Sequence, residues 1–181
     1  AEVEGGSRNI GGSWRMEGPQ NIGGRINALK ADPFNPDRIF AGSAAGGLFI
    51  TEDGGDNWVS ATDDFAWMAM GSIEFHPTEE GTVYIGTGDP QISSHPRIGN
   101  GVWKSTDYGQ NWEHLGLDSA RIISQLMVLE NNPSIVMAAT MGNPAVNGPD
   151  RGLYRSVNSG DSWTQVLLPS DSAGVNDIAY D

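Results

Sequence analysis

The sequence contains no cysteine, few basic residues and no long apolar run. Among its 181 residues there is no cysteine, so disulfide bonds and thiol chemistry are excluded. The lack of cysteine does not identify the cellular compartment of the protein. Only 10 lysine and arginine residues stand against 23 aspartate and glutamate residues, which gives a net charge of −13. A field of this sign repels phosphate backbones, so we expect no nucleic-acid binding. No apolar run approaches the roughly 20 residues of a membrane span, so we expect no membrane insertion.

One short pattern is present three times. It reads Ser or Thr, any residue, Asp or Asn, any residue, Gly, any two residues, Trp. The tryptophans follow one another at intervals of 54 and 51 residues. The copies are Thr51, Asp53, Gly55 and Trp58; Ser105, Asp107, Gly109 and Trp112; and Ser156, Asn158, Gly160 and Trp163. A pattern that recurs at a nearly fixed period is typical of a repeat protein, whereas an active site is normally unique.

Two short β-type runs precede each copy of the pattern. The first run ends at Pro33, Pro77 or Pro133, and the second spans residues 38–43, 82–88 or 135–141. Ile, Val, Tyr and Thr are frequent in these runs, and Gly, Pro, Asn and Asp separate them, as expected for strands joined by turns. Together with the two strands of the Trp hairpin, each repeat of about 50 residues has four strands, which is typical of a β-propeller blade.

We therefore predict an all-β fold with almost no helix, because no segment sustains a 3.6-residue apolar period. The fold is a β-propeller of four-stranded antiparallel blades, incomplete in this chain at about three and a half blades. The predicted blades span residues 25–67, 68–120 and 121–172, and a fourth begins at 173–181. Residues 1–24 form a leader, in which 13–17 either donate a closing strand or stay flexible. The remainder of the propeller, or another chain, covers the open strand edges.

We assign the repeated pattern a structural role. An Asp or Asn side chain in a tight hairpin accepts hydrogen bonds from nearby backbone N–H groups, and Gly supplies backbone angles that other residues resist. The tryptophan packs between neighbouring blades. Asn158 replaces Asp in the third copy, and a neutral amide is neither a general acid nor a hard metal ligand. All twelve residues of the three copies are therefore predicted to form the hairpins.

The register of the pattern resembles the Asp-box, the bacterial neuraminidase repeat of sialidases, sortilin-type receptors and xyloglucan-degrading endoglucanases. The longer stretch from Gly18 to Trp58, followed by "MGSIEFHP", "VYIGTGD" and the two later hairpins, is similar to the N-terminal part of large exported sortilin-like bacterial proteins. Many members of that group in the Bacteroidetes are cargo of the type IX secretion system. The resemblance implies a protein that is secreted or displayed on the outer cell surface, and it is more specific for fold than for activity.

The candidate binding surface is the rim opposite the Trp hairpins. Two loops on that rim are long, residues 89–100 and 142–150, and long loops on a rigid scaffold commonly carry recognition. The predicted ligand-binding residues are Arg25, Trp67, Asp89, His95, Arg97, Asn143 and Asp150. Trp67, together with Phe65 and Met68, either stacks on a sugar or anchors a peptide, or fills the space between the first two blades.

The sequence singles out no catalytic or metal centre. A glycosidase needs two carboxylates roughly 5–10 Å apart, and Asp89 and Asp150 are weak candidates because no local motif marks them. His95 is the one plausible metal ligand, whereas His76 stands where the other repeats have Asp32 and Asn132 and is predicted to form a turn. We predict no metal site and no cofactor.

These observations leave three functional hypotheses. The first is an exported, non-enzymatic interaction module of a larger protein, binding a glycan or a protein such as a component of the secretion machinery. The alternative is an extracellular glycoside hydrolase, sialidase-like or xyloglucanase-like, whose catalytic carboxylates lie partly outside this sequence. The third is a ring completed by another subunit.

Overall fold

The computed structural model describes residues 24–91 and 97–179. The strands are β1 (Ile26–Ala31), β2 (Ile39–Ser43), β3 (Leu48–Thr51), β4 (Val59–Ser60), β5 (Met70–Phe75), β6 (Val83–Thr87), β7 (Val102–Ser105), β8 (Glu113–His114), β9 (Ile123–Val128), β10 (Val136–Thr140), β11 (Gly152–Ser156) and β12 (Thr164–Leu167). Within the described residues the only helical element is the 3₁₀ turn η1 (Asp118–Ala120). The predicted all-β fold is confirmed. The proposed closing strand at 13–17 lies outside the described residues.

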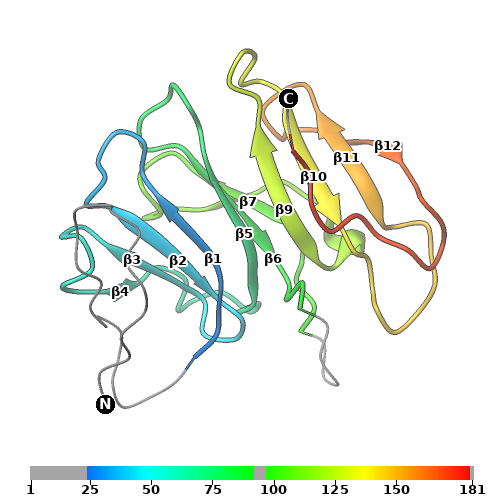
Figure 1. The fold of residues 1–181 in the computed structure, drawn as a ribbon, viewed down its shortest axis with the longest axis horizontal. Helices are drawn as coiled ribbons and strands as arrows, with labels where there is room; N and C mark the ends of the chain where they lie inside the picture. Colours follow the sequence, from blue (N-terminus) through cyan, green and yellow to red (C-terminus); the bar gives the residue numbers. More distant parts are fainter. Residues whose placement is uncertain (1–23, 92–96, 180–181) are drawn as a thin grey trace, which may run out of the picture.

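The strands form three sheets, each an antiparallel meander of four strands in chain order, β1 to β4, β5 to β8 and β9 to β12. The first strands of the sheets, β1, β5 and β9, lie side by side, and the later strands fan outward from them (Figure 1). Three sheets arranged in this way are blades of a β-propeller that the chain does not complete, as the sequence predicts.

Apolar side chains fill both junctions between blades. The first junction buries Phe40 and Leu48 of the first blade against Met70 and Ile85 of the second. At the second, Tyr84, Val102, Ile123, Leu126 and Val136 are buried together. Fully burying one such side chain stabilises the fold by about 1.5–3 kcal/mol. Each blade therefore depends on its neighbour for its core.

Glycine at position 86 lets the second and third blades approach closely. Gly86 lies in β6, and a Cβ atom built there would stand 2.5 Å from Cγ2 of Ile123 in β9. Gly42 in β2 has the same relation to Met70 of β5, at 2.8 Å. Any larger side chain at these two places would push the blades apart.

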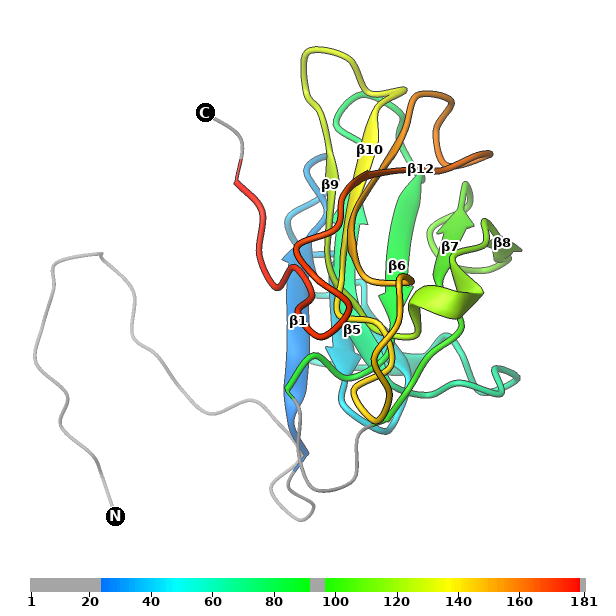
Figure 2. The same ribbon diagram turned by 90° about the vertical axis from the view of Figure 1, so that its right-hand side faces the viewer.

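After β12 the chain turns back across the third blade. Figure 2 shows this segment in red beside β9 and β10. The backbone N–H of Val175 donates to Thr140 O (3.0 Å), and that of Ile178 donates to the side chain of Gln125 (2.8 Å). Residues 168–179 contain no strand, so the described part of the predicted fourth blade is irregular. Among the described residues, no helix is long and apolar enough to cross a membrane.

Candidate functional site

The Trp hairpins share one hydrogen-bond scheme. In the second hairpin, Ser105 Oγ donates to Asp107 Oδ1 (2.7 Å) and accepts from the backbone N–H of Gly109 (2.8 Å). Asp107 in turn accepts from both the backbone N–H and the side-chain amide of Asn111, at 2.8 and 2.6 Å. Burial alone would raise the pKa of Asp107, but the hydrogen bonds from Asn111 and Ser105 lower it below its ordinary value. Both carboxylate oxygens are thus engaged within the turn.

The first and third hairpins repeat these contacts with different residues. Asp53 accepts from the side-chain amide and the backbone N–H of Asn57, and these bonds with that from Thr51 lower the pKa of Asp53 to about 2. In the third hairpin, Asn158 Oδ1 accepts from the backbone N–H of Ser162 (3.0 Å) in the same way. A carboxylate and a neutral amide therefore fill the same place with the same geometry.

The three tryptophans differ in burial because their surroundings differ. Trp112 packs against the core between the first two blades, and Trp163 against the core between the second and third. Trp163 Nε1 also donates to Leu115 O of the preceding blade (2.9 Å). Trp58 is 38% exposed, since no described strand packs on its side of the first blade. Burial of the tryptophan follows the presence of a preceding blade.

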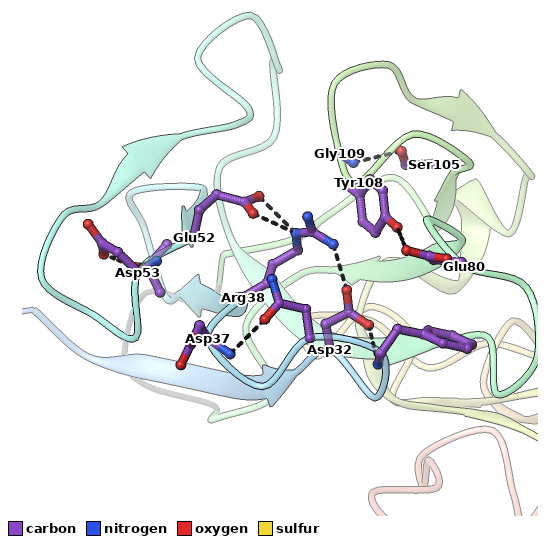
Figure 3. A network of polar contacts seen from close by, with 12 residues as sticks. Asp32, Asp37, Arg38, Glu52, Asp53, Glu80, Ser105, Tyr108 and Gly109 are labelled. Atoms are coloured by element: carbon purple, nitrogen blue, oxygen red, sulfur yellow. Dashed lines mark hydrogen bonds and ion pairs between the residues drawn. The ribbon is translucent and has the colours of Figure 1, made fainter.

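A charged network ties the first two blades together on the hairpin side (Figure 3). Arg38 donates through Nε to both carboxylate oxygens of Glu52 (2.8 and 2.9 Å) and through Nη1 to Asp32 Oδ2 (2.8 Å). Its guanidinium lies 3.6 Å from the ring centroid of Tyr108, whose hydroxyl donates to Glu80 (2.6 Å). Bonding to Glu52 raises the pKa of Arg38 above its ordinary value.

A hollow of about 970 Å³ lies beside this network rather than on the loop rim. It is an open groove between the outer hairpins of the first two blades, and Trp112 and Phe65 contribute to its wall. Asp53 and Asn111, which also line it, are already bound within their own turns. The groove is therefore a junction between blades.

On the loop rim, a buried carboxylate is bound by side chains from another blade. Asp89 follows β6 and is only 2% exposed. Its Oδ2 is ion-paired with Arg25 at the start of β1, and its Oδ1 accepts from Asn27 Nδ2 (3.2 Å) and the backbone N–H of Gln91 (3.1 Å). Asn27 also donates to Met70 O (3.0 Å). The Arg25 side chain remains 41% exposed, so Asp89 presents a fixed guanidinium to the solvent.

The third blade contributes a pocket to this rim. Its volume is about 260 Å³, and Arg151 lies in its wall. Arg151 is 5% exposed and donates through Nη2 to the carbonyl oxygens of Asn143 (2.8 Å) and Val146 (2.6 Å). These bonds fix the long loop at 142–150. In Figure 1 the start of β1 and the loops after β6 and β10 lie along the same lower side of the molecule.

The structure brings together only part of the predicted ligand set. Arg25 and Asp89 are in contact, and Asn143 accepts from Arg151, whereas Asp150 is exposed and has no ion-pair partner among the described residues. The Arg97 carbonyl accepts from the backbone N–H of Asp89 (2.8 Å), which closes the second loop. His95 lies outside the described residues. No group of three or more potential metal ligands is found in the described part of the chain.

The connection between the first two blades packs inward at one point. The ring of Phe65 lies 4.6 Å from that of Trp103 and 6.3 Å from that of Trp112, so Phe65 fills the space between the blades. Trp67 is half-buried. For Phe65 the structure therefore favours the packing alternative over ligand stacking.

Sequence reasoning missed Asn27 and the buried state of Arg151. Asn27 lies in β1, and nothing in the sequence of that strand indicates that its amide reaches Asp89, 62 residues away. Arg151 could have been singled out, because it immediately precedes the glycine that begins β11, where the other blades have Gly46 and Asn100. A long cation at a position otherwise filled by small residues is the signal.

Comparison with known proteins supports the fold and finds similar proteins that are named as xyloglucanases. No family model matches the chain. It is 32% identical over 96 residues to an oligoxyloglucan-reducing end-specific xyloglucanase of Emericella nidulans, covering 50% of this chain and 11% of that protein. It is 24% identical over 177 residues to a xyloglucanase of Acetivibrio thermocellus, covering 78% of this chain and 20% of that protein. The chain thus spans about a fifth or less of these curated relatives.

Solved structures with similar folds include glycoside hydrolases of family GH74 and a protein of another kind. An ancestral GH74 enzyme superposes with a TM-score of 0.63 at 22% identity, over 81% of this chain and 19% of that one. YCF48 from Cyanidioschyzon merolae superposes with a TM-score of 0.55 at 16% identity, over 84% of this chain and 42% of that one. At these identities the likeness establishes the β-propeller fold and nothing further.

Proposed function

We propose that this chain is part of an extracellular β-propeller glycoside hydrolase that acts on a xyloglucan-type polysaccharide, with the loop rim facing the glycan. The observation that carries the proposal is the sequence similarity to proteins named xyloglucanases, which extends through the repeats rather than through one short motif. The rim fits a glycan because it presents Arg25 and the long loop at 142–150 on a rigid scaffold.

Asp89 is better suited to positioning than to proton transfer. A general acid or nucleophile must present a free oxygen to the scissile bond, but both oxygens of Asp89 are occupied by Arg25, Asn27 and Gln91. We therefore assign Asp89 the task of orienting Arg25 toward the polysaccharide. The catalytic pair needs carboxylates about 5–10 Å apart, so in this proposal it is completed by residues beyond this sequence.

The test is whether the intact protein hydrolyses xyloglucan, which is measured by the release of reducing ends. With Asp89→Asn, a positioning role predicts a KM raised by about tenfold with kcat nearly unchanged, whereas loss of a catalytic carboxylate would lower kcat by several orders of magnitude. Asp161→Asn, at an exposed aspartate of the third Trp hairpin and away from the loop rim, is the control and should leave both constants unchanged. Failure of the intact protein to bind or cleave xyloglucan would contradict the proposal.

A second candidate, the non-enzymatic interaction module, is favoured by the full occupation of Asp89. One structural neighbour, YCF48, has been solved bound to a D1 peptide, so a propeller of this shape serves as a peptide-binding module in that protein. Under this second candidate function, the Trp hairpins are Asp-boxes and the protein is a sortilin-like cargo of the type IX secretion system. Retention of the protein by xyloglucan in an affinity gel without release of reducing ends would select this candidate. If the sequence of the intact protein beyond Asp181 contains no sorting domain, the hypothesis of type IX secretion is contradicted.

A further inference from the structure

The pocket of the third blade contains a buried cation without an acidic partner. Arg151 is 5% exposed, and no ion pair joins it to a carboxylate in the described part of the chain. Its Nε is buried and forms no hydrogen bond, although Nη2 is bound to two loop carbonyls. A buried guanidinium whose donors are not all satisfied, and whose charge is not balanced, is energetically costly. Such a group is ready to accept an anion.

The pocket around it is built by two segments that are bonded to each other. The loop after β10 supplies Met141, Pro144 and Arg151, and the returning segment supplies Ser172, Gly174 and Asn176. Gly148 N–H donates to Asp171 O (2.9 Å), and Val175 N–H donates to Thr140 O (3.0 Å). Ser124 Oγ donates to Val175 O (2.8 Å) from the neighbouring strand β9. The walls are therefore fixed against each other.

The lining matches a small ligand that is both anionic and partly apolar. No carboxylate lines the pocket, in a chain with a net charge of −13. Asp150, which precedes Arg151, is exposed and forms no ion pair with it. Arg151 and Asn176 supply N–H donors and Ser172 a hydroxyl, while Met141 and Pro144 supply apolar surface. A volume of about 260 Å³ is close to the lower limit of ligand pockets, so it suits one monosaccharide unit rather than a long chain.

We propose that the Arg151 pocket binds the carboxylate of an acidic sugar unit, such as a uronic acid, with the guanidinium as the counter-charge. A guanidinium forms strong charge-assisted hydrogen bonds with a carboxylate. Because the loop carbonyls take both N–H groups of Nη2, the carboxylate is bound through the remaining N–H donors of Arg151. The sugar ring places its hydroxyls near Ser172 and Asn176 and its apolar face against Met141 and Pro144. The anion site follows from Arg151 alone, and its assignment to a sugar rests on the proposed function.

The experiment is calorimetric titration of the intact protein with sodium glucuronate, sodium acetate and glucose at constant ionic strength. We expect glucuronate to bind with a millimolar Kd, acetate at least fivefold more weakly, and glucose not measurably. Equal affinity for glucuronate and glucose would overturn the anion site. Equal affinity for glucuronate and acetate would overturn the sugar assignment.

Two variants locate the site and one controls for charge. Arg151→Met removes the cation, and Asn176→Asp places a negative charge on the pocket wall while leaving Arg151 and its bonds to the loop in place. Each should weaken glucuronate binding at least tenfold. Arg155→Met removes an exposed arginine of the same blade and should change nothing. Undiminished binding by Asn176→Asp contradicts the proposal even if Arg151→Met does not fold. Xyloglucan hydrolysis by the same preparations reports separately on the proposed function.

Discussion

At the scale of single residues, the hairpins show that a carboxylate can be present for its shape rather than for its charge. Asp107 and Asn158 occupy equivalent turns and accept equivalent backbone hydrogen bonds. What the turn requires is an oxygen acceptor at a fixed distance from the backbone. Whether that oxygen belongs to a carboxylate or to an amide matters less for the turn.

Asp107→Ala should therefore destabilise the protein by about 1–3 kcal/mol, since the backbone N–H of Asn111 and the hydroxyl of Ser105 lose their acceptor. Asp107→Asn should cost less than half as much, because it recreates the third hairpin. The measurement is the free energy of unfolding from denaturant titration at neutral pH. Equal losses from the two variants would show that the negative charge itself is needed.

We expect His76 to make stability depend on pH near neutrality. It is buried, and its Nδ1 accepts from the backbone N–H of Glu79 (2.9 Å), which only an unprotonated nitrogen can do. Burial lowers the pKa of His76 below its usual 6.5, with Glu79 opposing and Lys104 adding to the shift. The unfolded chain therefore binds the proton more readily than the folded one, so stability is present above pH 6.5 and falls as the pH drops below it.

His76→Asn should remove this dependence, because Asn132 fills the equivalent position in the third blade. The midpoint of urea unfolding is compared at pH 7.5 and pH 5.5 in both proteins. We expect the parent to lose stability at the lower pH and the variant to lose measurably less. An identical pH response in the two proteins would assign the dependence to other groups.

At the scale of elements, neighbouring blades decide what each tryptophan contributes. Trp112→Ala should destabilise the protein by about 3–5 kcal/mol, because its ring packs into the core between two blades. Trp58→Ala, in the same position of the first hairpin, should cost clearly less since Trp58 is partly exposed. Thermal or denaturant unfolding of both variants measures the difference. Comparable losses would mean that the tryptophans stabilise their own hairpins rather than the junctions.

The blades were predictable from sequence because their signals are local. The proline that ends each first run, the short β-type runs and the Trp hairpins all lie within one repeat, so period and strand number could be predicted directly. The contact between Asn27 and Asp89 was not predictable, because it joins two blades and depends on how they are rotated against each other. Likewise, Arg151 is visible as an unusual residue, but its burial depends on the returning segment.

At the scale of the whole molecule, apolar surface is exposed at both ends of the row of blades. Leu29 on β1 is 65% exposed and Leu167 on β12 is 50% exposed. A sheet face of this kind associates with another apolar surface when one is available. In a propeller that surface is the next blade.

The chain by itself should accordingly self-associate, and Leu29→Lys combined with Leu167→Lys should reduce that association with little effect on folding stability. Sedimentation velocity over a tenfold concentration range provides the measurement. Thr164→Lys adds a charge at an exposed polar position and serves as the control. If Thr164→Lys reduces self-association equally well, the change in net charge and not the loss of apolar surface accounts for the effect.

The hairpin bonds have a consequence for how the protein reaches its native state. The side-chain bonds within the turn of the first hairpin join residues two or four positions apart, and the second and third hairpins do the same. Contacts of such short sequence separation form quickly and need no distant partner. Each Trp hairpin can thus form while later blades are still being synthesised. A ring of any number of blades can then assemble by adding blades whose hairpins have already formed.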